Sequence, residues 1–245
     1  MTRLSVNVNK VATIRNSRGG SVPDVLAAVR ACIAAGAPSI TVHPRSDERH
    51  ITRADVREIA TLLASEHPEV EYNIEGDPRP DWMELVLQHR PTQATLVPVR
   101  PGEITSEAGY DPRVDSAVVG PAVKRLKAEG IRVSLFVDPV LAPITWAKDM
   151  GADRVELYTE PFAKAFAAGS GEGVHSFERY VQAAEHAHKL GLGINAGHDL
   201  DLDNLVLFRT LPHLDEVSIG HALIGRALFH GLENVVREYV ACLQG

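Results

Sequence analysis

One short pattern recurs along the chain: a helix ends, a glycine follows, and an apolar strand then leads to a polar residue. The glycines are followed by strands ending in Thr41-Val-His43, Phe136-Val-Asp138, Leu157-Tyr-Thr159 and Ala196-Gly-His198. Glycine suits the position just past a helix end, because it adopts a left-handed backbone without steric cost. Repeated helix–strand units predict parallel strands joined by right-handed crossovers.

Eight such strands can be placed on the sequence. They are Leu4–Val8, Ser39–His43, Glu71–Glu75, Ala94–Pro98, Arg132–Asp138, Arg154–Thr159, Leu192–His198 and Glu216–His221. Eight strands that alternate with helices predict an α/β fold, a (β/α)8 TIM barrel, which forms one domain over residues 1–245. A doubly wound open sheet is the alternative, but it usually has a glycine-rich fingerprint after the first strand. Arg18-Gly-Gly20 does not match that fingerprint.

The segments between the strands contain recognisable helix signals. Asp24 and Thr52 are expected to cap helices, the second with Asp55 in a capping box. The glycine-rich segment 168–173 reads as a loop, followed by a helix that Ser176 caps. This loop and the polar segment 100–115 are either mobile lids or ordinary surface insertions. An amphipathic helix over 232–243 is either an interface or a cover for the bottom of the barrel.

Composition excludes several classes of protein. The formal net charge is −7 and there is no basic tract, so a nucleic-acid partner is not expected. An anionic substrate stays possible, because a local arginine cluster can outweigh a distant acidic surface. The sequence has no secretory signal and no membrane-spanning stretch, which indicates a cytoplasmic protein. Two cysteines in a chain of this length indicate reduced thiols.

The polar residues at the strand ends predict an enzyme. In a TIM barrel all strands end at one rim, where the active site lies. The side chains delivered to this rim are Asn7, Asn9, His43, Glu75, Asp138, Glu156, His198 and His221. Strand ends chosen for structure alone would not favour so many acid–base groups.

His43 is the leading candidate for acid–base catalysis. With His50, Glu75 and His198 on the same rim, it can take and return a proton near neutral pH. The alternative is a structural histidine that is hydrogen-bonded to a neighbour. Buried Glu75 and Glu156 are either bases with raised pKa values, anions that stabilise positive charge, or members of structural salt bridges.

Phosphate binding is indicated by two glycine turns and a group of cations. Asn195-Ala-Gly-His198 and Ser218-Ile-Gly-His221 end the last two strands, where TIM barrels often bind phosphate. A helix beginning near Ala222 would add its N-terminus. Positive charge near the rim comes from Lys10, Arg18, Arg45 and Arg49. Each of these cations alone is more often a solvated surface residue.

Seven stretches carry a resemblance that covers nearly the whole chain. They are residues 6–19, 40–52, 73–75, 96–98, 133–138, 195–198 and 219–226, including Thr-Val-His-Pro-Arg-Ser-Asp-Glu-Arg-His50 and Asn-Ala-Gly-His198. Together they resemble the pyridoxine 5′-phosphate synthase family of vitamin B6 biosynthesis. The resemblance implies a TIM barrel with extra helices, assembled as a homo-octamer, with no metal and no organic cofactor.

The resemblance also implies a reaction between two phosphorylated small molecules. 1-Deoxy-D-xylulose 5-phosphate would condense with 3-amino-2-oxopropyl phosphate to give pyridoxine 5′-phosphate, phosphate and water. By motif, His43 and Glu75 would be proton acceptors, His198 the proton donor and Glu156 a transition-state stabiliser. The implied ligands of the sugar phosphate are Arg45, His50 and Thr105. Those of the amino-ketone phosphate are Asn7, Arg18, Gly220 and His221, with Asp199 nearby.

Two positions depart from the family pattern. Members of the family read Asn-Ile-Asp-His where this chain has Asn7-Val-Asn9-Lys10. Asn9 and Lys10 are therefore expected to bind substrate with different groups. Members also have glycine where this chain has Asp199. A carboxylate beside a phosphate is unfavourable, unless only its backbone N–H faces the ligand.

Two rival functions make different use of the same residues. A metal-dependent aldolase or isomerase would coordinate a divalent ion through His43, Glu75, Glu156 and His198, although no compact metal motif is present. A phosphate-binding regulator would bind a sugar phosphate without turnover, and the acid–base groups at the rim argue against it.

Overall fold

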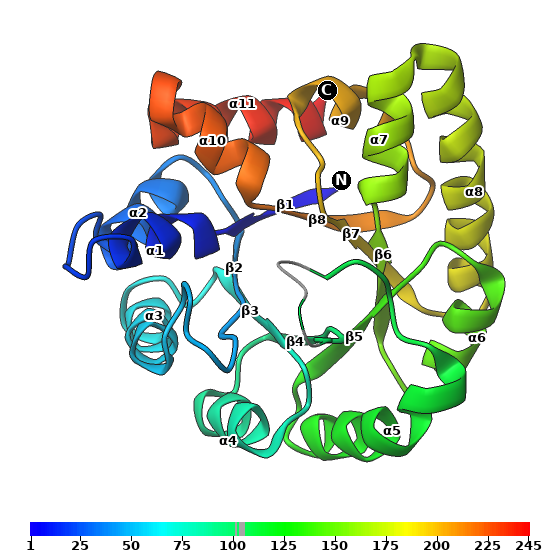
Figure 1. Cartoon of the computed structure of the whole chain (residues 1–245), viewed down its shortest axis with the longest axis horizontal. Coiled ribbons are helices and arrows are strands. Elements are labelled where there is room, and N and C mark those ends of the chain that lie inside the picture. The colour runs from blue at the N-terminus through cyan, green and yellow to red at the C-terminus, as the bar shows by residue number, and fades with distance from the viewer. Residues whose placement is uncertain (101, 103–105) are drawn as a thin grey trace.

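A computed structural model describes residues 1–100, 102 and 106–245. Within these residues, eight parallel strands close into a barrel in chain order (Figure 1). The strands are β1 (Arg3–Asn7), β2 (Ser39–Val42), β3 (Glu71–Gly76), β4 (Gln93–Leu96), β5 (Arg132–Val137), β6 (Arg154–Tyr158), β7 (Gly193–Gly197) and β8 (Leu214–Ile219). The prediction of a TIM barrel is confirmed, and the closed strand order rules out an open sheet.

Helices surround the barrel and connect its strands (Figure 1). They are α1 (Asn9–Asn16), α2 (Val25–Ala34), α3 (Arg53–Glu66), α4 (Pro80–His89), α5 (Pro112–Ala128), α6 (Leu141–Asp149), α7 (Glu160–Ala168), α8 (Ser170–Lys189), α9 (Leu202–Phe208), α10 (His221–His230) and α11 (Leu232–Gln244). The predicted caps are confirmed. Asp24 accepts hydrogen bonds from the backbone N–H groups of Leu26 and Ala27, and Thr52 forms a capping box with Asp55.

Two local predictions are wrong. The segment 168–173 is not a loop, because α7 and α8 are separated only by Gly169, and Ser176 lies inside α8 instead of capping a helix. Gly173 allows this tight turn, since a Cβ atom there would lie 3.0 Å from the Cα atom of Phe166. The first strand is also followed directly by α1, a helix that the sequence pattern did not indicate.

The apolar core lies between the sheet and the helices. Alternate strand residues such as Val6, Ile40, Ile74 and Leu135 are fully buried in it. Burial of this kind supplies the main driving force for folding. Helix α11 completes the ring by packing against α2, α9 and β1, so it does not cover the bottom of the barrel.

The interior of the barrel is polar, in contrast to the branched apolar layers usual in this fold. Hydrogen bonds cross it between strands that are not neighbours: Asn195 on β7 donates to Gln93 on β4, and Ser218 on β8 donates to Glu75 on β3, both at 3.4 Å. The buried polar residues that share this strand face include Ser5, Ser39, Thr41, Asn73, Thr95, Ser134, Glu156 and Glu216. Many of these buried polar groups hydrogen-bond to one another, but among the described residues Oγ of Ser134, Oε2 of Glu156 and Oε2 of Glu216 have no hydrogen-bond partner.

Two further expectations can be compared with the described residues. Cys32 and Cys242 are both free thiols, as predicted. None of the helices described here combines the length and the apolar character needed to cross a bilayer.

Candidate active site

His43 is held at the end of β2 by its backbone. Its N–H donates to the side-chain oxygen of Asn9 at 2.9 Å, and the side chain of Asn7 in turn accepts the N–H of Asn9 at 3.0 Å. His43 is only 8% exposed, and Nδ1 of its imidazole lies 3.8 Å from Oε2 of Glu75. Among the described residues, Nε2 of His43 has no hydrogen-bond partner. The ring therefore has one nitrogen near a carboxyl group and one available for a ligand.

The environment of His43 favours its neutral form. Burial lowers the pKa of His43 to about 3, and the positive charges that act from His50 and Arg45 add to this effect. Burial also lowers the pKa of His50 to about 4, with Lys10 and Arg45 contributing. Both imidazoles are neutral at pH 7. Because Nδ1 of His50 accepts the N–H of Ile51 at 2.9 Å, its ring carries the proton on Nε2 and can donate there.

Three buried glutamates have pKa values above that of an ordinary glutamate. Burial raises the pKa of Glu75 to about 8, and the nearby Glu216 raises it further, although Ser218 donates a hydrogen bond that opposes the shift. The pKa of Glu156 is also raised well above its usual value by burial and by Glu75 and Glu216. Burial likewise raises the pKa of Glu216. Burial thus raises the pKa values of all three acids and lowers the pKa of the neighbouring His43.

The second histidine of the site, His198, follows β7 on the opposite side of the barrel. Its ring packs edge-on against Tyr158 of β6, with centroids 5.1 Å apart. Its Nδ1 lies 3.3 Å from Oδ2 of Asp199. The hydroxyl of Thr159 donates to the carbonyl oxygens of both Gly197 and His198, which fixes the strand end.

The glycines of the two predicted phosphate turns make room for protein side chains. A Cβ atom on Gly197 would lie 2.5 Å from Oε1 of Glu156. A Cβ atom on Gly220 would lie 3.0 Å from Cβ of Asn7. Asn7, Gly220 and His221 are therefore brought together where β1 meets β8, and α10 begins at His221 as expected.

The predicted cations fall into two groups. Arg45 is buried, and its charge acts on both His43 and His50, while Lys10 acts on His50. Arg49 pairs with Asp47 at 2.5 Å. Arg18 lies in the exposed turn after α1 and is not among the main charges acting on either histidine. Thr105 lies outside the described residues.

Sequence reasoning missed several residues that shape this site. Arg79 donates to the carbonyl oxygen of Pro44 at 2.9 Å and pairs with Asp77 at 2.6 Å, so it anchors the loop after His43. Ser218 holds Glu75. Asp138, directly after β5, accepts the N–H of Gly109 at 3.1 Å and so holds the preceding loop. Period-two alternation along the strands would have identified Ser218 as inward-facing.

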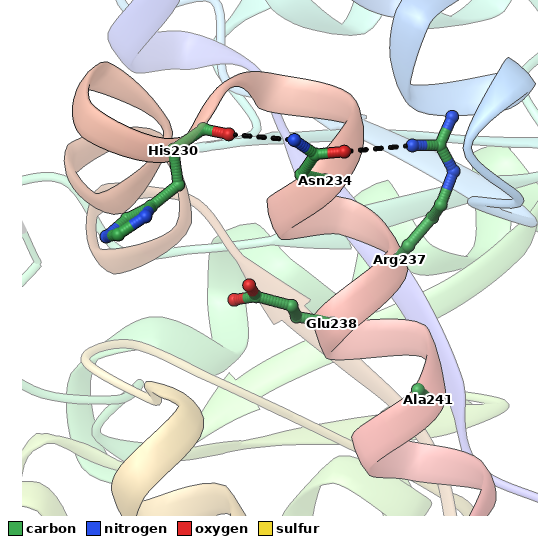
Figure 2. Close-up of a pocket in the computed structure, with 5 residues that line it drawn as sticks. All are labelled: His230, Asn234, Arg237, Glu238 and Ala241. Carbon is green, nitrogen blue, oxygen red and sulfur yellow. Dashed lines mark hydrogen bonds between the residues drawn. The ribbon is translucent and has the colours of Figure 1, made fainter.

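A separate hollow lies on the outer helices, away from the strand ends. Figure 2 shows it between α10 and α11, lined by His230, Asn234, Arg237, Glu238 and Ala241. Its charges are already paired, because Glu238 binds Arg226 at 2.7 Å and Arg237 binds Glu233 at 2.6 Å. No predicted site residue lines it, so the strand-end group remains the candidate active site.

The described residues also bear on the metal-dependent rival. Over residues 1–100, 102 and 106–245, no three His, Cys, Asp or Glu side chains are grouped so that they could hold a metal ion.

Comparisons with known proteins agree on one family. Residues 4–245 match the family described as pyridoxal phosphate biosynthesis protein PdxJ. The chain is 52% identical over 240 residues to the pyridoxine 5′-phosphate synthase of Porphyromonas gingivalis, covering 98% of each chain. It is 50% identical over 245 residues to the enzyme of that name in Bacteroides fragilis, covering 100% of each. The structure of 3-hexulose-6-phosphate synthase from Salmonella typhimurium has a TM-score of 0.65 at 12% identity, covering 99% of each chain, and shows the fold alone.

Proposed function

The chain belongs to the PdxJ family of pyridoxine 5′-phosphate synthases, and from this premise we propose its reaction and the roles of its residues. It condenses 1-deoxy-D-xylulose 5-phosphate with 3-amino-2-oxopropyl phosphate, releasing pyridoxine 5′-phosphate, phosphate and water. The observation that carries the proposal is the buried His43–Glu75 pair, with 3.8 Å between Nδ1 and Oε2, in which burial lowers the pKa of His43 and raises that of Glu75. Ring closure by imine formation and dehydration needs repeated proton transfers, which such a pair supplies.

In this proposal His43 takes the first proton. Its neutral ring and its Nε2, which has no partner within the described chain, make it a base at neutral pH. Glu75, with a pKa of about 8, holds a proton in the resting site and can exchange it with His43. Glu75 would therefore first donate its proton and only later accept one.

The other two groups serve the later steps. His198 donates a proton to a leaving oxygen. The pKa of Glu156 is raised in the empty site, and positive charge on the substrate nitrogen would favour its carboxylate, because an opposite charge favours the ionised form.

The substrate ligands combine the family resemblance with the residues that the structure brings together. Arg45 and His50 hold the sugar phosphate, with the Nε2–H of His50 as a neutral donor, and the resemblance adds Thr105. Asn7, Gly220 and His221 hold the amino-ketone phosphate near the N-terminus of α10, where a helix favours anions, and the resemblance adds Arg18. Asn9 uses its amide oxygen on His43, so only its amide N–H groups and the ammonium of Lys10 are free to meet a substrate. No metal and no organic cofactor takes part.

The test uses purified protein treated with a chelator and supplied with both phosphorylated substrates. We expect pyridoxine 5′-phosphate to form, measured by absorbance and confirmed by mass spectrometry. Absence of product from folded protein would reject the synthase assignment. Product only after a divalent metal is returned would favour the metal-dependent barrel instead. Binding of a sugar phosphate without turnover would indicate a regulator.

We also propose that the chain works in the cytoplasm as a homo-octamer. Support comes from exposed apolar side chains on α10, where Leu228 is 66% exposed and Phe229 is 86% exposed. Large apolar side chains exposed side by side often mark contact surfaces. Light scattering on the 26.6 kDa chain is expected to give an octameric mass, and Phe229→Asp a smaller one. A monomeric mass for the native protein would contradict the proposal.

A further inference from the structure

We infer that Asp199 is a positioning residue for His198, and not a ligand of the substrate phosphate; this role rests on the proposed function of His198 as proton donor. Oδ2 of Asp199 lies 3.3 Å from Nδ1 of His198. The nearby imidazole of His198 is the main reason why the pKa of Asp199 is lowered. The carboxylate is therefore turned toward the imidazole.

The backbone explains how the two side chains meet. His198 and Asp199 both have left-handed conformations, with φ of 90° and 61°. Non-glycine residues rarely adopt this region, and aspartate and asparagine tolerate it best. The turn is held on both sides, because Thr159 binds the carbonyl oxygen of His198 and Asn204 donates to that of Asp199 at 3.1 Å. A strained turn fixed in this way sets the side-chain directions of both residues.

The other charges near this turn already have partners or act at longer range. Glu160 of α7 accepts from the hydroxyl of Tyr158 and pairs with Lys164 at 2.6 Å. Lys164 and His221 act on Asp199 through their charges, and Asp138 acts on Tyr158. Among the described residues the structure gives one carboxylate in an ion-pair contact with the ring of His198, and it belongs to Asp199.

This contact has a chemical consequence. A carboxylate at Nδ1 fixes the orientation of an imidazole and stabilises its protonated form, which leaves the Nε2 proton for transfer. Asp199 would thus hold the ring of His198 in one orientation, with Nε2 directed away from the carboxylate. A phosphate would be repelled by the same carboxylate, so the residue serves the donor and not the anion.

The kinetic test uses two variants that both fit a left-handed backbone. Asp199→Asn keeps the size and a hydrogen-bond acceptor but loses the charge, while Asp199→Gly removes the side chain. In both, we expect the basic limb of the kcat profile to move about one pH unit lower and kcat above neutral pH to fall about tenfold. KM for both substrates should stay within about twofold, because ground-state binding is not removed. A large rise in KM with an unchanged kcat profile would instead make Asp199 a substrate ligand.

A second measurement needs no substrate. Diethyl pyrocarbonate acylates neutral imidazole, so the rate at His198 against pH, followed by peptide mass spectrometry, reports its protonation. We expect the midpoint to fall by about one unit in both variants. The same curve for His175, whose side chain is 71% exposed, should not move.

The outcomes separate the inference from the proposed function. An unchanged midpoint at His198 in both variants would overturn the role of Asp199, whatever the activity. A shift in Asp199→Gly alone would assign the effect to the turn and overturn the role of the carboxylate. Failure of the native protein to make product would reject the synthase assignment and leave the modification result to decide whether the pair exists.

Discussion

Replacing His43 with alanine is expected to lower kcat on the order of a hundredfold or more, the range for loss of a general acid–base group. The expectation follows from a ring that is neutral, buried and 3.8 Å from the carboxyl group of Glu75. Product formation with both substrates measures it. His67→Ala is the matched control, since His67 ends α3 at the start of β3 and lies away from the strand ends. It should keep full activity.

The same variant has a predicted effect on stability. The folded-state pKa of His43, about 3, lies below the ordinary value of 6.5, so neutral His43 contributes stability above pH 6.5 that is lost as pH falls toward 3. Between pH 7 and pH 5 the native protein should lose about 2 kcal/mol of unfolding free energy for this reason. His43→Ala should not show that loss. Urea denaturation at both pH values makes the comparison.

Two results would contradict this account of His43. Near-native kcat in His43→Ala, with folding confirmed by circular dichroism, would remove the ring from the chemistry. Equal acid sensitivity in the native protein and the variant would show that His43 is protonated in the folded state. The first result concerns its role and the second its environment, so they can fail independently.

The barrel was predictable because its signals are local. A glycine after several of the helices, and an apolar run after each of these glycines, reflect backbone conformation and burial, which act on short segments. Gly36, Gly130, Gly151 and Gly191 all have positive φ in the structure. The polar strand ends then followed from topology, since parallel strands in a closed barrel end at one rim. Thus His43, Glu75 and His198 could be assigned to that rim without knowing their partners.

The polar interior of the barrel could have been predicted from the alternation of polar and apolar residues along its strands. Strands such as Ser39-Ile-Thr-Val42 alternate polar and apolar residues, whereas strands buried on both faces usually read as apolar runs. The polar residues of this alternation face the interior and form hydrogen bonds there, including Ser5 to Thr41 at 2.6 Å and Thr95 to Asn73 at 2.9 Å. These pairings join residues 22 or more positions apart. No local pattern specifies such partners.

Contacts that the sequence pattern does not reveal shape two further segments. Gly169 and Gly173 suggested a loop, but tertiary packing against Phe166 turns them into a helix junction. Glycine in a helix costs only about 1 kcal/mol, which packing can offset. Asn9 was predicted as a substrate ligand, and its amide oxygen proves to hold the backbone of His43, 34 residues away. The role of its remaining amide group stays a prediction.

Replacing Glu75 with glutamine is expected to lower kcat on the order of a hundredfold or more while raising stability at alkaline pH. Glutamine resembles the protonated acid and keeps the contact with Ser218, but it has no proton to exchange with His43. The folded-state pKa of Glu75, about 8, is raised above the ordinary 4.5, so its favourable contribution is complete below pH 4.5 and is lost as pH rises through 8. Relative to the variant, the native protein should lose on the order of 3 kcal/mol between pH 5 and pH 9.

Glu71 offers a matched control on the same strand and the same face. Burial alone would raise the pKa of Glu71, but hydrogen bonds from Arg132 and Arg3 outweigh it and lower the pKa. Its carboxylate therefore stabilises the fold above pH 4.5, and this contribution is lost on acidification. Glu71→Gln should be less stable than the native protein at pH 7 and approach it at low pH. The substitutions Glu71→Gln and Glu75→Gln, four residues apart, are thus predicted to change stability with opposite dependence on pH.

The pair of curves tests the proposed chemistry as well as the fold. Urea midpoints from pH 4 to pH 9, measured for the native protein and both variants, distinguish a protonated Glu75 from an ionised one. Parallel curves for the native protein and Glu75→Gln would mean that Glu75 is already a carboxylate at neutral pH and serves as a base from the start. Diverging curves with a large loss of kcat would mean that the site stores its proton on Glu75. His43 would then be the group that begins the reaction.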